Sequence, residues 1–249
     1  MPFRGVADIV FCLDASDSMS PCFEQVRSHL GDFISSLSRP GQSSWDLRFD
    51  FVAHSCSQDG KVHRLASARS RSLVGDLYGQ GQSSDRFFTK DVGELKTALG
   101  GITTAGNEAT LLGLDFALDF PWREAAACHR VVILMTDEPF ETGAIQAEQL
   151  AVLTKLIGKI QTLKVMLYLV TPESQVFSSL SEVDRCEHWV VDGQGNGLAS
   201  ADFKEVFSFI GKSVSVSQDQ TRKQGTSLAP RALFGQDCWG TATSQNFRE

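Results

Sequence analysis

A short and almost entirely apolar run near the N-terminus, residues 6–13, constrains the fold of this chain more than any other segment. It reads VADIVFCL and is rich in β-branched and aromatic residues. Unbroken apolar runs of this length are typical of strands that are buried on both faces, as in the centre of a parallel sheet. The run is followed by Asp14, Ser16 and Ser18, at the predicted strand's carboxyl end. Open α/β sheets bind their ligands at that edge.

Apolar strand patterns alternate with amphipathic helix patterns along the rest of the chain. Further strands are predicted over residues 45–54, 62–68, 130–136, 165–170 and 187–191. Helices are predicted over residues 23–37, 91–99, 110–120, 144–163 and 201–214. This alternation predicts a doubly wound, Rossmann-like α/β fold. Its sheet is mostly parallel and six-stranded, with helices on both faces and one antiparallel edge strand, residues 62–68.

The helix patterns also predict which side chains are buried. In the helix over 144–163 the expected inner face consists of Leu150, Leu153, Leu156, Ile157 and Ile160. In the helix over 110–120, Asp115 and Asp119 are expected to form the exposed polar face.

Residues 217–249 differ in composition from the rest of the chain. Gln, Ser, Thr and Gly dominate there, and neither helical nor strand periodicity is present. We therefore predict one domain over residues 1–216 and an extended or disordered C-terminal tail over 217–249. The aromatic residues Phe234, Trp239 and Phe247 favour a tail that docks on the domain or on a partner.

Composition and charge narrow the classes of function. The net charge is −7, with both signs scattered along the chain, which argues against nucleic-acid binding. No apolar run reaches the roughly 20 residues that span a bilayer, and the N-terminus lacks the pattern of a signal peptide. The six cysteines form no CxxC pair, which favours reduced thiols. These features predict a cytoplasmic protein that binds neither nucleic acid nor membrane.

Three polar clusters are expected to meet at the carboxyl edge of the sheet. The first is Asp14, Ser16 and Ser18, the second is the loop over residues 103–110, and the third is Asp137 with Glu138. Carboxylate and hydroxyl oxygens are ligands for Mg²⁺, Mn²⁺ or Ca²⁺. Two carboxylates and several neutral ligands leave a divalent cation partly unneutralised, with room for one further anionic oxygen.

The order of these clusters resembles that of the von Willebrand factor type A (vWA) domain family, in its intracellular prokaryotic branch. The resemblance rests on Asp-x-Ser-x-Ser after the first strand, a loop Thr, and Asp137 after the apolar strand ILMT, and it covers residues 7–214. It implies a metal-ion-dependent adhesion site (MIDAS) in which Asp14, Ser16, Ser18, the loop Thr and Asp137 hold a divalent cation. Mg²⁺ is the expected ion, with Mn²⁺ or Ca²⁺ as alternatives. Glu138 stands where the family usually has Gly.

The loop offers more than one Thr as the metal ligand. Thr110, followed by Leu-Leu-Gly and a helix, fits the family pattern best and is the predicted ligand, with Thr104 as the alternative. Glu108 would then line the site. It would either bind a water on the metal or stand in for a partner's carboxylate.

The resemblance implies an adaptor without catalytic activity, which binds a protein partner through an Asp or Glu placed on the metal. Family members of this kind act beside AAA+ ATPases or other components of multi-protein systems, including bacterial stress and defence systems. One alternative is a Mg²⁺-dependent hydrolase that uses Asp14. A phosphatase of the haloacid-dehalogenase type needs a second Asp where this chain has Ser16. The other alternative is a structural vWA domain with no functional metal.

Overall fold

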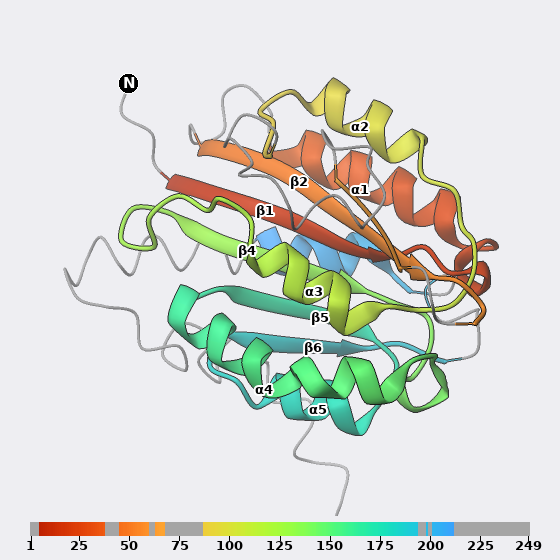
Figure 1. Cartoon of the computed structure of the whole chain (residues 1–249). Coiled ribbons are helices and arrows are strands. Elements are labelled where there is room, and N and C mark those ends of the chain that lie inside the picture. The colour runs from red at the N-terminus through yellow and green to blue at the C-terminus, as the bar shows by residue number, and fades with distance from the viewer. Residues whose placement is uncertain are drawn as a thin grey trace, which may run out of the picture.

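The computed structural model describes residues 5–37, 45–59, 63–67, 87–193, 198 and 201–211. One six-stranded sheet has the order β3-β2-β1-β4-β5-β6 (Figure 1). Its strands are β1 (Gly5–Asp14), β2 (Trp45–Cys56), β3 (His63–Ser67), β4 (His129–Met135), β5 (Met166–Thr171) and β6 (Cys186–Val190). Neighbouring strands are parallel, except that β3 runs antiparallel to β2. The predicted doubly wound, mostly parallel sheet is confirmed.

The central strand β1 is buried on both faces because strands and helices surround it. It pairs with β2 on one side and with β4 on the other. Ile9, Phe11 and Leu13 face one hydrophobic core, whereas Val10 and Cys12 face the other. This two-sided burial explains why the sequence of β1 is apolar without alternation.

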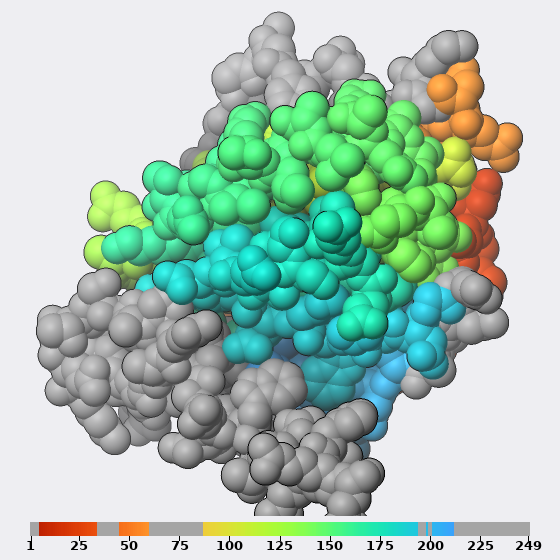
Figure 2. Space-filling model, turned by 90° about the horizontal axis from the view of Figure 1, so that it is seen from below, coloured from red at the N-terminus to blue at the C-terminus, as the bar shows by residue number. Residues whose placement is uncertain are grey.

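Helices cover both faces of the sheet. On one face lie α1 (Phe23–Leu37), α2 (Val92–Gly100) and the helical residues 203–211. On the other lie α3 (Thr110–Leu118), α4 (Gln146–Leu163) and α5 (Gln175–Ser181). Two short 3₁₀ turns, η1 (Asp17–Met19) and η3 (Phe140–Thr142), follow β1 and β4. In the space-filling view α4 (green) and α5 (cyan) lie side by side on the surface (Figure 2).

The predicted inner face of α4 is wrong at one position. Leu150 is 45% exposed, and the neighbouring Gln149 is 1% exposed in its place. Gln149 Oε1 accepts a hydrogen bond from the backbone N–H of Leu111 at 2.8 Å, and Nε2 donates to the Ala144 carbonyl at 2.9 Å. The first N–H groups of a helix have no acceptor within that helix, so Gln149 satisfies one of those of α3. The hydrogen bonds of Gln149 therefore determine which side of α4 faces the interior at this turn.

Asp115 is buried, although the pattern of its helix predicts that it lies on the exposed polar face. It is 6% exposed and forms ion pairs with Lys155 and Lys159 of α4. Asp119 lies nearer the surface and also binds Lys159. The prediction failed for Asp115 because α4, rather than solvent, covers that side of α3.

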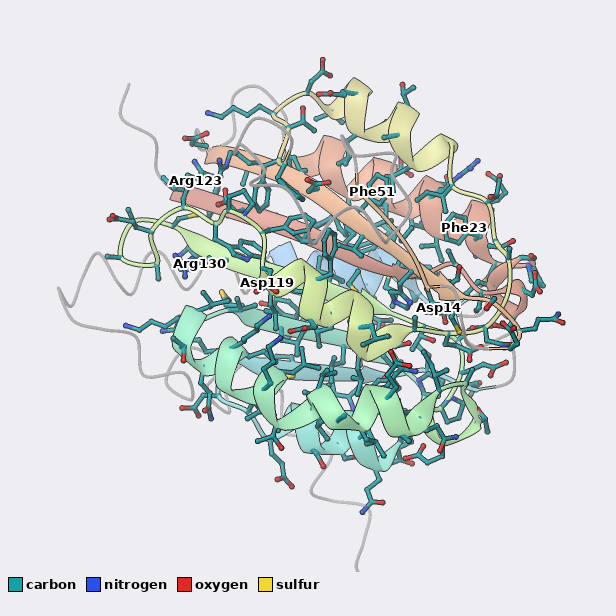
Figure 3. The ribbon with its side chains drawn as sticks, in the orientation of Figure 1. Asp14, Phe23, Phe51, Asp119, Arg123 and Arg130 are labelled. Carbon is teal, nitrogen blue, oxygen red and sulfur yellow. The ribbon has the colours of Figure 1, made fainter. Side chains whose placement is uncertain are left out.

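At the amino ends of the strands, a buried ion network ties a loop to the sheet. Asp8 of β1 is fully buried and accepts hydrogen bonds from Arg48 Nε at 2.8 Å and from Arg123 Nε at 2.8 Å. Burial acts to raise the pKa of Asp8, but the hydrogen bonds from Arg48 and Arg123 outweigh it and lower the pKa. Arg123 and Asp14 lie at opposite ends of the sheet (Figure 3). The network is therefore remote from the predicted metal site.

Some sequence features have no described structure. The predicted tail, residues 217–249, lies outside the described residues, as does Cys238. The described cysteines, Cys12, Cys22, Cys56, Cys128 and Cys186, are unpaired thiols. Within the described ranges, no helix combines the length and the apolar character needed to cross a bilayer.

Candidate metal centre

Asp14 stands at the carboxyl end of β1 and is fixed from two directions. Its Oδ1 accepts a hydrogen bond from the backbone N–H of Ser16 at 2.9 Å, and its Oδ2 accepts one from Thr136 Oγ1 at 2.6 Å. The residue is fully buried. Leu13 and Met135 are register partners in β1 and β4, so the next residues along the two strands, Asp14 and Thr136, are brought together.

A chain of hydroxyl groups joins the β1 motif to Asp137. Ser16 Oγ and Ser18 Oγ are 2.9 Å apart, and Ser18 Oγ donates to Asp137 Oδ1 at 3.0 Å. Asp137 follows β4, the neighbour of β1 in the sheet. The structure thus brings together four of the five predicted ligands, namely Asp14, Ser16, Ser18 and Asp137.

Among the described residues, no Lys or Arg forms an ion pair with either carboxylate of this cluster. Both residues are fully buried, and Asp137 Oδ2 has no hydrogen-bond partner among the described residues. Burial raises the pKa of Asp14 to about 7, with smaller increases from the charges of Glu108 and Asp137, and burial also raises the pKa of Asp137. A buried carboxylate oxygen without a donor is costly. Two buried acids, two hydroxyls and one unpartnered oxygen are a donor set that fits a hard divalent cation.

The loop before α3 is held against the β1 motif by backbone hydrogen bonds. Ala105 N–H donates to the Ala15 carbonyl at 2.8 Å, and Asp17 N–H donates to the Gly106 carbonyl at 2.9 Å. Gly106 has φ +78°, and a Cβ there would lie 1.9 Å from the Cys56 carbonyl oxygen. Only glycine fits at this position, so the loop is fixed between the ends of β1 and β2.

The two candidate Thr ligands lie in different surroundings. Thr110 is the first residue of α3 and is 3% exposed. In the described part of the chain, no hydrogen bond connects it to the four clustered ligands. Thr104 lies further back along the loop, where its hydroxyl is hydrogen-bonded to that of Ser20. The ligand role of Thr110 stays a prediction.

A cleft opens beside the cluster. Its lining comes from the β1 motif, the end of β2, the loop before α3 and the segment before α4, and consists of Asp17, Ser18, Gln58, Gly106, Asn107, Glu108, Glu138, Thr142, Gly143 and Ala144. All the charged side chains of this lining are acidic. Glu108 is 8% exposed. Burial raises its pKa most, and the charges of Glu138 and Asp137 raise it further, whereas two backbone hydrogen bonds lower it by less.

Local sequence patterns missed one functional side chain, that of Thr136. It had been assigned only to the apolar strand, yet its hydroxyl fixes Asp14. The available signal was its position directly before Asp137 at a strand end. In the described part of the chain, no three His, Cys, Asp or Glu side chains are gathered to hold a metal. Any ion in the described centre would therefore depend on hydroxyl oxygens as well as on Asp14 and Asp137.

His54 is the β2 register partner of Asp14 and is packed rather than exposed to the cleft. Burial lowers its pKa to about 3, so the ring is neutral at pH 7. It packs on Gly113 of α3, where a Cβ would come within 2.5 Å of the ring.

Fold and site together define a doubly wound domain with a polar cluster at the carboxyl edge of its sheet, and solved structures of vWA domains share this fold. No family model and no curated protein matches the chain. The structure is similar to that of proximal thread matrix protein 1 from the mussel byssus, at 17% identity, TM-score 0.53, 88% of this chain and 48% of that chain. Another structure of that protein, described as having a zinc-occupied MIDAS motif, matches at TM-score 0.55 and 17% identity, over 86% of this chain and 46% of that one.

A von Willebrand factor type A protein from Catenulispora acidiphila matches at TM-score 0.50 and 16% identity, over 82% of this chain and 42% of that chain. The chain therefore spans less than half the length of these matched chains. It has the vWA fold, in agreement with the resemblance seen in the sequence.

Proposed function

We propose that this vWA domain holds a divalent cation at the edge of its sheet and uses it to bind a protein partner. The observation that carries the proposal is the unpartnered, buried Oδ2 of Asp137, which lies beside hydroxyls and a second buried carboxylate. The cation would be held by Asp14, Ser16, Ser18 and Asp137, with Thr110 as the predicted fifth ligand. Mg²⁺ is the proposed ion, with Mn²⁺ or Ca²⁺ as alternatives. The zinc-occupied MIDAS motif of the mussel byssus protein supports a divalent ion in this fold.

The acidic cleft makes partner binding depend on the cation. Asp17 and Glu138 line it, and Ser18, which also lines it, donates a hydrogen bond to Asp137. A partner's Asp or Glu is repelled by these charges when no cation is present. A bound divalent ion reverses the local sign and offers a charge-assisted bond to the incoming carboxylate. Partner binding is therefore expected to fail in chelator.

The proposed class of partner rests on the resemblance of the sequence, and the proposed cellular location rests on that resemblance together with the composition of the chain. We propose a cytoplasmic adaptor of the intracellular prokaryotic branch, acting beside an AAA+ ATPase or another component of a bacterial stress or defence system. The proposed role includes no catalysis. Ser16 occupies the position where a phosphatase of the kind considered above needs an acid, and its hydroxyl contacts that of Ser18.

The test is affinity capture with the whole chain, in Mg²⁺ and in chelator. The double variant Asp14→Ala, Ser16→Ala removes two proposed ligands. Asp17→Ala is the matched control, because Asp17 belongs to the same motif but is exposed. A partner that is held by wild type and by the control, and lost by the double variant and in chelator, supports the proposal. A partner set that is identical in all samples refutes it, and Mg²⁺-dependent phosphoester hydrolysis that is lost in Asp14→Ala supports the enzyme alternative instead.

A further inference from the structure

The carboxylate of Glu108 lies across the cleft from the loop that carries it. Its backbone follows Asn107, which pairs with Cys56 through two hydrogen bonds of 2.8 and 2.9 Å. Its side chain crosses to the segment before α4, where it accepts a hydrogen bond from the Ala144 backbone N–H. Oε2 lies 3.2 Å from the position that a Cβ on Gly143 would occupy. The missing side chain at residue 143 therefore leaves the space in which this carboxylate sits.

Glu108 also belongs electrostatically to the metal centre. Its charge raises the pKa of Asp14 more than the charge of Asp137 does, although Asp137 is part of the hydrogen-bonded cluster. Its hydrogen bonds come from backbone N–H groups, and no Lys or Arg of the described segments forms an ion pair with it. Three largely buried carboxylates thus influence one another electrostatically, without a Lys or Arg partner among the described residues. The unpartnered Oδ2 of Asp137 independently points to a cation there.

The geometry separates Glu108 from the direct ligands. Asp14, Glu108 and Asp137 do not form one of the three-residue clusters that can hold an ion, as judged over the described residues. Glu108 nevertheless lines the same cleft as Ser18. Mg²⁺ and Mn²⁺ sites commonly retain several waters, and carboxylates around a metal site commonly bind through them.

Given the cation of the proposed function, we propose that Glu108 also holds that cation from the loop before α3, by way of a bridging water. Gly143 leaves room for this carboxylate, since a Cβ there would lie 3.2 Å from Oε2. A partner's carboxylate would then enter a site that already contains a third acid, so Glu108 competes with it.

The test measures Mn²⁺ binding to the whole chain by isothermal titration calorimetry. Glu108→Gln is expected to weaken Mn²⁺ binding by about tenfold or more, the range seen when outer groups of metal sites are lost. Glu138→Gln is the matched control, because it removes the same charge from the same cleft, and it should change binding by less than about threefold. Equal losses in Glu108→Gln and Glu138→Gln would overturn the proposal.

One further variant keeps the test decisive. Asp14→Ala separates this inference from the proposed function. If Asp14→Ala binds Mn²⁺ as wild type does, the metal site itself is refuted. If it abolishes binding while Glu108→Gln behaves like Glu138→Gln, only the role of Glu108 is refuted.

Discussion

In metal-free buffer, ionisation of Asp14 should make the folded chain progressively less stable between about pH 4 and 7, relative to a variant that does not titrate at this position. Asp14 is fully buried, and burial raises its pKa from the ordinary 3.8 to about 7. The unfolded chain releases this proton near pH 4, whereas the folded chain keeps it until about pH 7. At Asp14 the folded state therefore keeps a proton that the unfolded state has lost, and the stability that this group contributes is complete below pH 4 and is lost progressively up to about pH 7. Two histidines act in the opposite direction over this range, because burial lowers the pKa of His54 to about 3 and that of His129 to about 4. The contribution of Asp14 is therefore measured as the difference between wild type and a variant that does not titrate there.

The size of this effect follows from the rise in the pKa of Asp14. Each pKa unit corresponds to about 1.4 kcal/mol, so a shift of roughly three units corresponds to about 4 kcal/mol of unfolding free energy. The raised pKa values of Glu108 and Asp137 act in the same direction. A bound cation opposes the trend, because it binds the deprotonated carboxylates. At a free concentration of 100 times Kd it should add about 2.7 kcal/mol to the stability.

The assay is guanidinium chloride unfolding, followed by tryptophan fluorescence, at several pH values between 4 and 7.5. Relative to wild type, Asp14→Asn should gain stability progressively from about pH 4 to 7, because the amide does not titrate. Asp17→Asn is the control, since Asp17 is exposed in the same motif, and it should keep the wild-type slope. The reasoning is refuted if Asp14→Asn and wild type have the same pH dependence. Saturating Mn²⁺ should reduce the difference in pH dependence between wild type and Asp14→Asn.

Three further substitutions test the backbone and packing of the domain. Gly106→Ala should cost about 2–4 kcal/mol of unfolding free energy and weaken Mn²⁺ binding, because φ is +78° and a Cβ would lie 1.9 Å from the Cys56 carbonyl; near-wild-type unfolding and titration curves would contradict this. Gly158→Ala, in α4 with open space around it, should stabilise the chain by about 0.5–1 kcal/mol in the same unfolding assay, and a loss of stability would show hidden crowding. Arg123→Met should cost about 3 kcal/mol, because it removes a partner of the buried Asp8, and calorimetry should find Mn²⁺ affinity unchanged; a parallel loss of affinity would show that the two ends of the sheet are coupled.

The strand that organises the sheet and most of the metal centre could be predicted from local patterns. The unbroken apolar run of β1 is specific to a strand with neighbours on both sides and helices on both faces. Asp14, Ser16, Ser18 and Asp137 were predicted because polar residues that follow such strands must emerge at one edge of a parallel sheet. Hydrogen bonds now connect Ser16 to Ser18 and Ser18 to Asp137.

The errors all involve partners that are distant along the chain. Periodicity predicted Leu150 as buried, but the N-terminus of α3 recruits Gln149 to the interior. The same reasoning placed Asp115 at the surface, where Lys155 and Lys159 of α4 in fact cover it. A pattern within one helix reports the face of that helix and not which element packs against it.

By itself, the sequence determined the alternation of strands and helices, the burial of β1 and the placement of oxygen ligands at one edge, since each depends on the spacing of neighbouring residues. Only the tertiary structure decided that Thr136 fixes Asp14, that Asp137 keeps an unpartnered oxygen, and that Glu108 reaches across the cleft to the segment at Gly143 and Ala144. The physical reason is that hydrogen bonds and charge interactions depend on distances of a few ångströms between atoms. Those distances are set by the register of β1 with β4 and by the loops packed over their ends.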